Sequence, residues 1–176
     1  ANLWGAKLYR TNLTGANLSG ARLSNADLSQ SELTGADLSN AELYNTQLMG
    51  ANLSEANLTR ADLQKAKLTN TNFHRANLTS AWLASAQLQD ANLSQANLFK
   101  STLNSANLQD ADLSQANLME ASLIKANLQD VDLQDADLNK TILFKASVSK
   151  AALIEAQLCL TSLPDYTMRS RDCDRS

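Results

Sequence analysis

Leucine recurs at every fifth position from Leu3 to Leu163, and only Phe73 and Val148 replace it. An α-helix turns about 100° per residue, so steps of five residues would scatter these leucines around the whole helix. In a flat strand the side chains alternate with period two, so an odd spacing would place successive leucines on opposite faces. The spacing therefore argues against one long helix and against one flat strand.

The residues around each leucine predict how the backbone uses this spacing. The position two before the leucine is Ala, Ser or Thr, and once Val131, while the residue between them is most often Asn or Asp. Residues two apart lie on the same side of an extended segment, so both face inward and the Asn or Asp faces outward. The two positions after the leucine are mostly polar or Gly, which is typical of turns.

Short extended sides joined by a corner in every repeat close into coils, and stacked coils pair their backbones at about 4.8 Å, as strands do. The pattern therefore predicts a β-solenoid with a narrow interior. The alternative is a disordered low-complexity chain, which regular apolar spacing and a hydrophobic content of 44% oppose.

The segments ADLSNAEL, ANLSEANL and ANLQDADL resemble the A(N/D)LXX motif of the pentapeptide-repeat family. The spacing alone does not say how many sides close a coil. The resemblance implies an all-β fold: a right-handed quadrilateral parallel β-helix of about eight coils with four repeats, or about 20 residues, in each. We accordingly expect a β-helix over residues 1–163 and a C-terminal cap or tail over residues 164–176.

The C-terminal segment is similar to the end of some cyanobacterial members, in which a Cys, a Pro-Asp-Gly turn and a second Cys follow one another. Here Tyr166 stands where that turn has Gly. The resemblance implies a disulfide between Cys159 and Cys173, and the alternative is two unrelated thiols in a reducing cytosol. A disulfide would indicate an oxidising compartment such as a periplasm or thylakoid lumen; otherwise we expect a cytoplasmic protein.

The composition argues against several classes of function. The 15 basic and 18 acidic residues give a net charge of −3 and are dispersed, which does not favour nucleic-acid binding. No apolar run approaches the roughly 20 residues that span a bilayer, so we expect a soluble chain with no membrane contact. His74 is the only histidine, and neither a metal-ligand spacing nor a phosphate-binding loop is present. We therefore predict a non-enzyme with no catalytic or metal site, no cofactor and no small-molecule substrate, shaped as a convex rod without a pocket.

If four repeats form each coil, two outward columns stand out. The first is apolar and is either a scatter of exposed residues or a contact surface for a partner or a second copy. The second is acidic; its repulsion is compensated by a cation, by a basic partner, or by solvent and salt alone. The apolar column contains Trp4, Tyr44, Trp82, Ile124, Ile142 and Phe144, and the acidic column contains Asp90, Asp110 and Asp130.

These features predict a non-enzymatic structural or protein-interaction rod from a cyanobacterium-like host, with a protein partner or self-association. The alternative comes from the resemblance, because some pentapeptide-repeat proteins mimic duplex DNA and bind a type II topoisomerase such as gyrase. Mimicry needs strong negative charge along the rod, and the near balance of charges opposes it.

Overall fold

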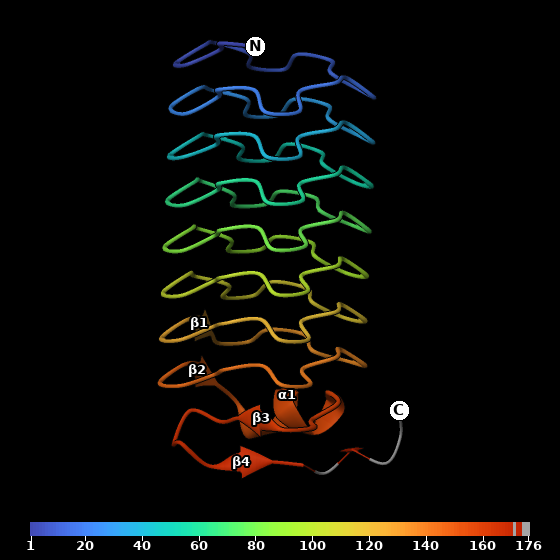
Figure 1. Cartoon of the computed structure of the whole chain (residues 1–176), viewed down its shortest axis with the longest axis vertical. Coiled ribbons are helices and arrows are strands. Elements are labelled where there is room, and N and C mark those ends of the chain that lie inside the picture. The colour runs from blue at the N-terminus through green and yellow to red at the C-terminus, as the bar shows by residue number, and fades with distance from the viewer. Residues whose placement is uncertain (171, 174–176) are drawn as a thin grey trace.

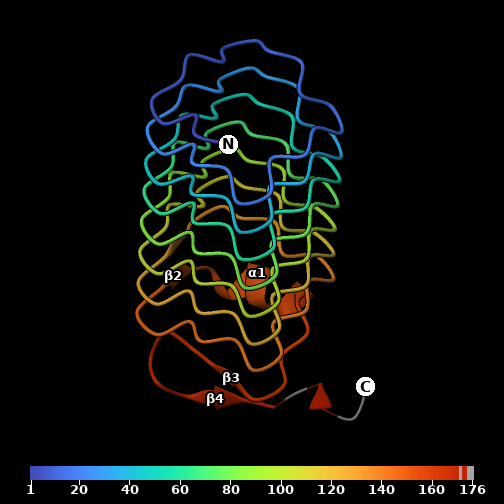
Figure 2. The ribbon, with the colours of Figure 1, turned by 45° about the horizontal axis from the view of Figure 1, so that its top comes forward.

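The protein is a stack of coils that lie in register on one another. The structure, a computed structural model, describes residues 1–170 and 172–173. The second residue of each five-residue unit pairs in parallel with its equivalent in the next coil, as in Asn2↔Arg22 and Lys67↔Gln87. Figures 1 and 2 show the stacked coils, with the N-terminus at one end and a folded cap at the other.

Each coil has four sides, which we call sides 1 to 4 in chain order. In the first coil these sides are, in turn, the segments 1–5, 6–10, 11–15 and 16–20, and the same four sides recur in each later coil. Sides of the same number therefore stack into one flat outer face of the rod.

The corners are β-turns with a left-handed residue in the fifth position. The leucine carbonyl accepts from the N–H three residues later, as in Ala6 N to Leu3 O at 3.0 Å. The fifth residue has a positive φ in every unit from Gly5 to Lys145. A turn with a positive φ at its third residue favours Gly or Asn, and β-branched residues fit it worst. No Val, Ile or Thr occupies a fifth position in these units, which is a corner signal that the sequence analysis did not use.

Gln115 gives a direct test of this corner, because its φ is 57°. We expect Gln115→Gly to raise the free energy of unfolding by about 0.5–1 kcal/mol. Glycine removes the steric cost of the left-handed conformation, and this gain exceeds the extra conformational entropy that glycine loses on folding. Gln115→Val should lower the free energy of unfolding by about 1 kcal/mol. Urea unfolding of both variants beside Gln115→Ala measures these changes. A stabilised Val variant or a destabilised Gly variant would contradict the assignment.

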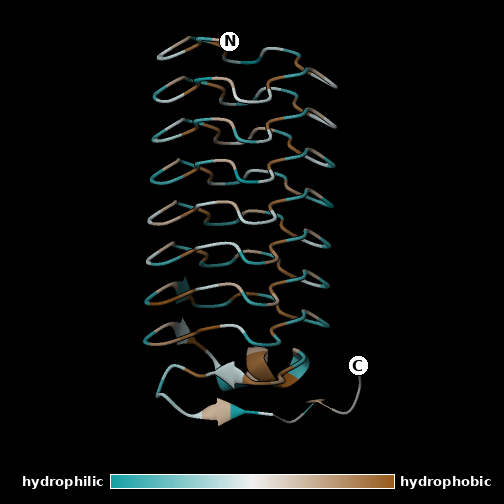
Figure 3. Ribbon diagram, in the orientation of Figure 1, coloured by the Kyte–Doolittle hydropathy of each residue, from teal (hydrophilic) through white to brown (hydrophobic). Residues whose placement is uncertain are grey.

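The core is the column of leucines with small residues beside them. Leu98 and Ala96 are both buried, as the spacing predicted, and Phe73 occupies a leucine position with no exposed surface. Where Thr replaces the small Ala after the first coil, its hydroxyl donates to a leucine carbonyl of the preceding coil, as in Thr71 Oγ1 to Leu48 O at 2.8 Å. Apolar residues recur at the same places in each coil of Figure 3, so the interior is continuous along the shaft.

The C-terminal end departs from the expected all-β fold. The leucine spacing continues through Leu153, but residues Lys150–Glu155 form helix α1, whose N-cap Ser149 accepts from Ala152 N at 3.1 Å. The expectation of an unbroken β-helix is therefore wrong over this side. The helix sequence KAALIE is rich in helix formers and has Ala where the repeat usually has Asn or Asp. The coil then resumes, with Ile142 paired to Ser162.

Short strands and a disulfide complete this end of the molecule. Strand β1 (Asn127–Leu128) pairs in parallel with β2 (Ser147–Val148), and β3 (Thr161–Ser162) pairs antiparallel with β4 (Met168–Arg169). Within residues 1–170 and 172–173, no helix has the length and apolar character needed to cross a membrane.

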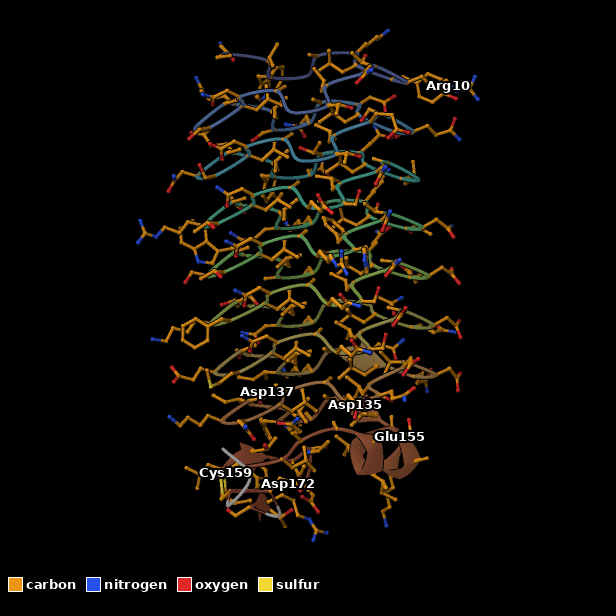
Figure 4. The ribbon with its side chains drawn as sticks, turned by 90° about the vertical axis from the view of Figure 1, so that its right-hand side faces the viewer. Arg10, Asp135, Asp137, Glu155, Cys159 and Asp172 are labelled. Carbon is orange, nitrogen blue, oxygen red and sulfur yellow. A yellow bond between two sulfur atoms is a disulfide. The ribbon has the colours of Figure 1, made fainter. Side chains whose placement is uncertain are left out.

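The predicted pairing of Cys159 with Cys173 is present, with a Cα–Cα distance of 4.8 Å. Beside it, the Leu158 N–H donates to Asp172 Oδ2 and the Asp172 N–H donates to Leu158 O, both at 3.1 Å. Figure 4 shows Cys159 and Asp172 together in the cap. The tail is thus bound to the last coil covalently and by hydrogen bonds. Residues 171 and 174–176, which belong to the predicted cap, lie outside the described residues.

Candidate interaction face

The second-position Asn or Asp has a structural task that the sequence analysis missed. Its side-chain oxygen accepts the backbone N–H of the fourth residue, as in Met119 N to Asn117 Oδ1 at 3.0 Å. This Asx turn satisfies a corner N–H that the backbone leaves open. The N–H of Ser39 is the main cause that lowers the pKa of Asp37, and the Ser39 hydroxyl and the Asn57 amide add to it. The signal in the sequence was Asn or Asp two residues before most corners, above all on sides 3 and 4.

Side 4 makes this bond in every coil from residue 17 to residue 137, and side 3 makes it in nearly every coil before helix α1. The acceptors are Asn17, Asp37, Asn57, Asn77, Asn97, Asn117 and Asp137 on side 4, and Asn12, Asn52, Asn72, Asn92, Asp112 and Asp132 on side 3.

Sides 1 and 2 both depart from this rule: side 2 has Gln47, Lys67 and Gln87 at successive second positions, and side 1 departs most over its C-terminal half. The second positions in that half of side 1 are Trp82, Thr102, Ser122 and Ile142 in four successive coils, and neither Trp nor Ile carries an acceptor. At one corner a neighbouring coil supplies the missing acceptor: Asn104 Oδ1 accepts from Ile124 N at 3.0 Å and from Ser122 Oγ at 2.7 Å. Residues here are therefore not those that the fold itself favours.

All six apolar residues predicted from the sequence lie on side 1. Trp4, Trp82 and Ile142 are 63%, 51% and 41% exposed, Tyr44 is 37% exposed, and Ile124 and Phe144 are half-buried. The structure brings together only the C-terminal members. Ile124, Ile142 and Phe144 occupy two successive coils, whereas a coil without such a residue follows each of Trp4, Tyr44 and Trp82.

Tyr166 joins this C-terminal cluster, and the sequence analysis treated it only as part of the cap. Its ring centroid lies 4.0 Å from that of Phe144 at an interplanar angle of 38°, and its side chain is exposed. We call this C-terminal cluster, together with Trp82 two coils before Ile124, the apolar strip of side 1; its members are Trp82, Ile124, Ile142, Phe144 and Tyr166.

Lysines frame the apolar strip along both corners. Lys125 and Lys145 occupy the corner between sides 1 and 2, and the Lys145 ammonium lies 5.0 Å from the centre of the Phe144 ring. Lys100 and Lys140 occupy the corner between sides 4 and 1 and share Glu120, at 3.5 and 3.6 Å. Side 1 contains no Asp or Glu from residue 81 to residue 145. Asp165, beside Tyr166, is the next carboxylate of side 1, and the four lysines outnumber Asp165 and Glu120, so the strip lies in a positive environment.

The predicted acidic column lies on a different edge. Asp90, Asp110 and Asp130 are exposed in successive coils at the corner between sides 2 and 3. In the described part of the chain, no group of three or more His, Cys, Asp or Glu side chains is arranged to hold a metal ion. Stacked amides also bond along the shaft, with Asn117 Nδ2 donating to Asn97 Oδ1 at 3.2 Å.

His74 lies half-buried on side 3, where its Nδ1 is 2.9 Å from Ser94 Oγ in the next coil. Ser94 Oγ in turn donates to Asn92 Oδ1. This is a hydrogen-bonded stack on a flat outer face, like those of the asparagines.

The expectation of a rod without any pocket is wrong at the C-terminal end. A hollow of about 420 Å³ lies between helix α1 and the β3–β4 hairpin, because the last leucine layer is only partly covered by the tail. Its lining residues are Lys150, Leu153, Ile154, Leu158, Leu163, Asp165, Thr167 and Arg169.

Stacked coils with four turned corners and a leucine core define a parallel β-helix of the solenoid class. The family model for pentapeptide repeats matches eight copies over residues 1–35, 16–55, 56–95, 82–118, 96–135 and 121–158. The chain therefore belongs to the pentapeptide-repeat family, and its fold is a right-handed β-helix.

Two solved structures show how far this likeness extends. HetL, a pentapeptide-repeat protein involved in heterocyst differentiation regulation in the cyanobacterium Nostoc sp. strain PCC 7120, is 31% identical, with 96% of this chain and 91% of HetL covered and a TM-score of 0.53. QnrB1, a plasmid-mediated fluoroquinolone resistance protein, is 17% identical over 91% of this chain and 81% of QnrB1, with a TM-score of 0.81, which shows a common fold alone. Among curated proteins no significant match is found.

Proposed function

We propose that this protein is a non-enzymatic interaction rod and that the apolar strip of side 1 is its contact surface. The observation that carries the proposal is that exposed apolar residues stand where side 1 breaks the Asx pattern, whereas side 2 has polar residues such as Gln and Lys where it breaks the pattern. In four successive coils of side 1 the second position lacks the Asn or Asp that sides 3 and 4 have there. Two of these positions are occupied by the exposed residues Trp82 and Ile142. Residues that break a protein's own folding rule tend to lie at functional sites.

The role of the contact is structural or regulatory, in a cyanobacterium-like host. HetL supports this proposal because it is similar over nearly the whole of both chains and is described as involved in the regulation of differentiation. The disulfide supports a location in an oxidising compartment, such as a periplasm or thylakoid lumen, rather than in the cytoplasm.

The alternative is a DNA mimic that binds gyrase. QnrB1 supports only the common fold at 17% identity, and the charges oppose the alternative: Lys100, Lys125, Lys140 and Lys145 surround side 1 where a mimic needs carboxylates. Inhibition of gyrase-catalysed supercoiling by the purified protein would favour the mimic over the interaction rod.

Capture experiments with matched variants test the proposed contact surface. We expect the wild type to capture a protein from a cyanobacterial lysate, and Ile142→Asp to capture at least tenfold less of that protein. The reason is that a carboxylate replaces an apolar anchor of the strip. Gln87→Asp is the control, since Gln87 is an exposed second-position residue of side 2. Light scattering of the same proteins detects self-association through the strip. If the wild type, Ile142→Asp and Gln87→Asp captured equal amounts of protein and had equal masses in light scattering, the proposal would be contradicted.

A further inference from the structure

We propose that the partner segment that binds the apolar strip of side 1 is an acidic amphipathic α-helix of another protein. This inference rests on the proposed function and names the chemistry of the partner. It follows from three properties of the strip: how its backbone is paired, how its apolar residues are spaced, and which charges surround it.

The backbone of side 1 is already paired on both edges. Leu123 N donates to Ile142 O at 2.8 Å, and Ile142 N donates to Ala121 O at 3.0 Å, so each coil uses its peptide groups on its neighbours. A partner strand therefore finds no open edge to extend along this side. An extended segment lying here would leave its own peptide groups without partners from the rod. A helix forms its backbone hydrogen bonds internally and presents only side chains to the rod. Side 1 can bind such a partner because it too has only side chains available for contact.

The spacing of the strip matches one face of a helix. Trp82 and Ile142 are both second-position residues three coils apart, which is about 14 Å at about 4.8 Å per coil. A helix covers that distance in roughly 10 residues, and its pitch of about 5.4 Å is close to the coil spacing. Trp82 and Ile124 lie two coils apart and Ile124 and Ile142 one coil apart, so apolar residues at i, i+7 and i+10 or i+11 of a partner helix laid along the rod meet them in turn.

The charges around the strip indicate which charged residues the partner helix carries beside its apolar face. Lys125 and Lys145 have no carboxylate partner in the described part of the chain, and Lys100 and Lys140 share the single carboxylate of Glu120. The framing residues therefore carry an excess of positive charge on both corners. Glu or Asp on either flank of the helix would meet these ammonium groups.

A second copy of this chain fits the strip less well. Two strips placed face to face on antiparallel rods would bring Lys125 and Lys145 of one copy against the same lysines of the other, and on parallel rods they would meet the corner that carries Lys100, Glu120 and Lys140. Like charges at an interface are unfavourable, and no carboxylate of side 1 lies between residues 81 and 145 to offset them. An acidic helix from a different protein avoids this repulsion.

Selection from a displayed library of randomised helical peptides tests the inference. The bait is the full, disulfide-intact chain. We expect the enriched peptides to carry net negative charge and apolar residues at i, i+7 and i+10 or i+11. A synthetic enriched peptide should bind the Lys125→Glu/Lys145→Glu variant at least tenfold more weakly in fluorescence anisotropy. Binding should also weaken at least tenfold with Ile142→Asp, and it should be unchanged with Lys67→Glu, a control on side 2.

Each other outcome decides against the inference in a distinguishable way. Enriched peptides that lose binding with Ile142→Asp but carry no acidic excess would overturn the helix chemistry and leave the interaction rod standing. Peptides that are indifferent to all side 1 substitutions, or an unenriched library, would overturn both proposals. A dimeric mass in light scattering that Ile142→Asp reduces to the monomer would assign the strip to a second copy.

Discussion

Leu98→Asp is expected to abolish the cooperative folded state. Leu98 has no exposed surface, and its layer is enclosed by coils above and below. Truncating a buried leucine alone costs about 2–5 kcal/mol, and an unpaired carboxylate in the same place costs more. The total free energy of unfolding of a domain is only about 5–15 kcal/mol. Because each coil is stabilised by its neighbours, the loss in one coil also weakens both adjacent interfaces.

Circular dichroism during urea unfolding measures this effect. Leu98→Ala keeps the test informative if the aspartate variant does not fold, and it should lower the free energy of unfolding by about 2–5 kcal/mol. Gln87→Asp, in the same coil but exposed, should change it by less than about 0.5 kcal/mol. Equal stability of the Leu98 and Gln87 variants would mean that the leucine column is not the core.

Loss of the Cys159–Cys173 bond is expected to produce the second large effect. The bond closes a loop with a sequence separation of 14, which corresponds to about 3 kcal/mol from the restricted unfolded chain. It also holds Asp172 against Leu158, which has only 4% of its surface exposed. Without the bond the tail is held mainly by hydrogen bonds, and the last leucine layer becomes more exposed to solvent.

Three variants separate this bond from the side chains themselves. Cys159→Ser, Cys173→Ser and the double variant should lose the same free energy of unfolding, because removal of either sulfur removes one bond. Wild-type protein in reducing agent should unfold at the same urea concentration as the variants. Additive losses in the double variant, or no effect of the reducing agent, would show that the bond does not stabilise the cap.

The sequence predicted the interior of the fold well. Leucine and a small residue two apart were expected to face inward, and Leu98 and Ala96 do so. The break at helix α1 was missed because the leucine spacing continues through Leu153, and the spacing of the leucines carries no information on local helix propensity. The positive φ of the fifth residues and the Asx bonds were also missed, although the exclusion of β-branched residues at one position and the excess of Asn and Asp at another were visible in the sequence.

The candidate contact surface was predicted in part. The four-sided coil implied by the family resemblance was enough to place Trp82, Ile124 and Ile142 on one side. The packing of Tyr166 on Phe144 required the path of the tail, which no repeat defines. The ion pairs of Glu120 with Lys100 and Lys140 join residues of neighbouring coils, so they could not be predicted before the stacking of the coils was known.

Every assignment of a residue to side 1 depends on the claim that four repeats make one coil. Cross-linking between engineered cysteines tests this claim most directly. The test pair is Lys67→Cys with Gln87→Cys, because these residues pair in parallel across neighbouring coils and make no Asx bond. One control pair combines Lys67→Cys with Trp82→Cys, a repeat earlier than Gln87. The other combines Lys67→Cys with Asn92→Cys, a repeat later.

A disulfide needs two Cα atoms about 4.4–6.8 Å apart, which stacked residues at about 4.8 Å satisfy and residues on adjacent sides of different coils do not. Mild oxidation followed by peptide mass mapping should therefore show an efficient bond between positions 67 and 87. It should show little bonding in either control pair. A bond that forms preferentially in a control pair would contradict the four-sided coil and the side assignments that depend on it.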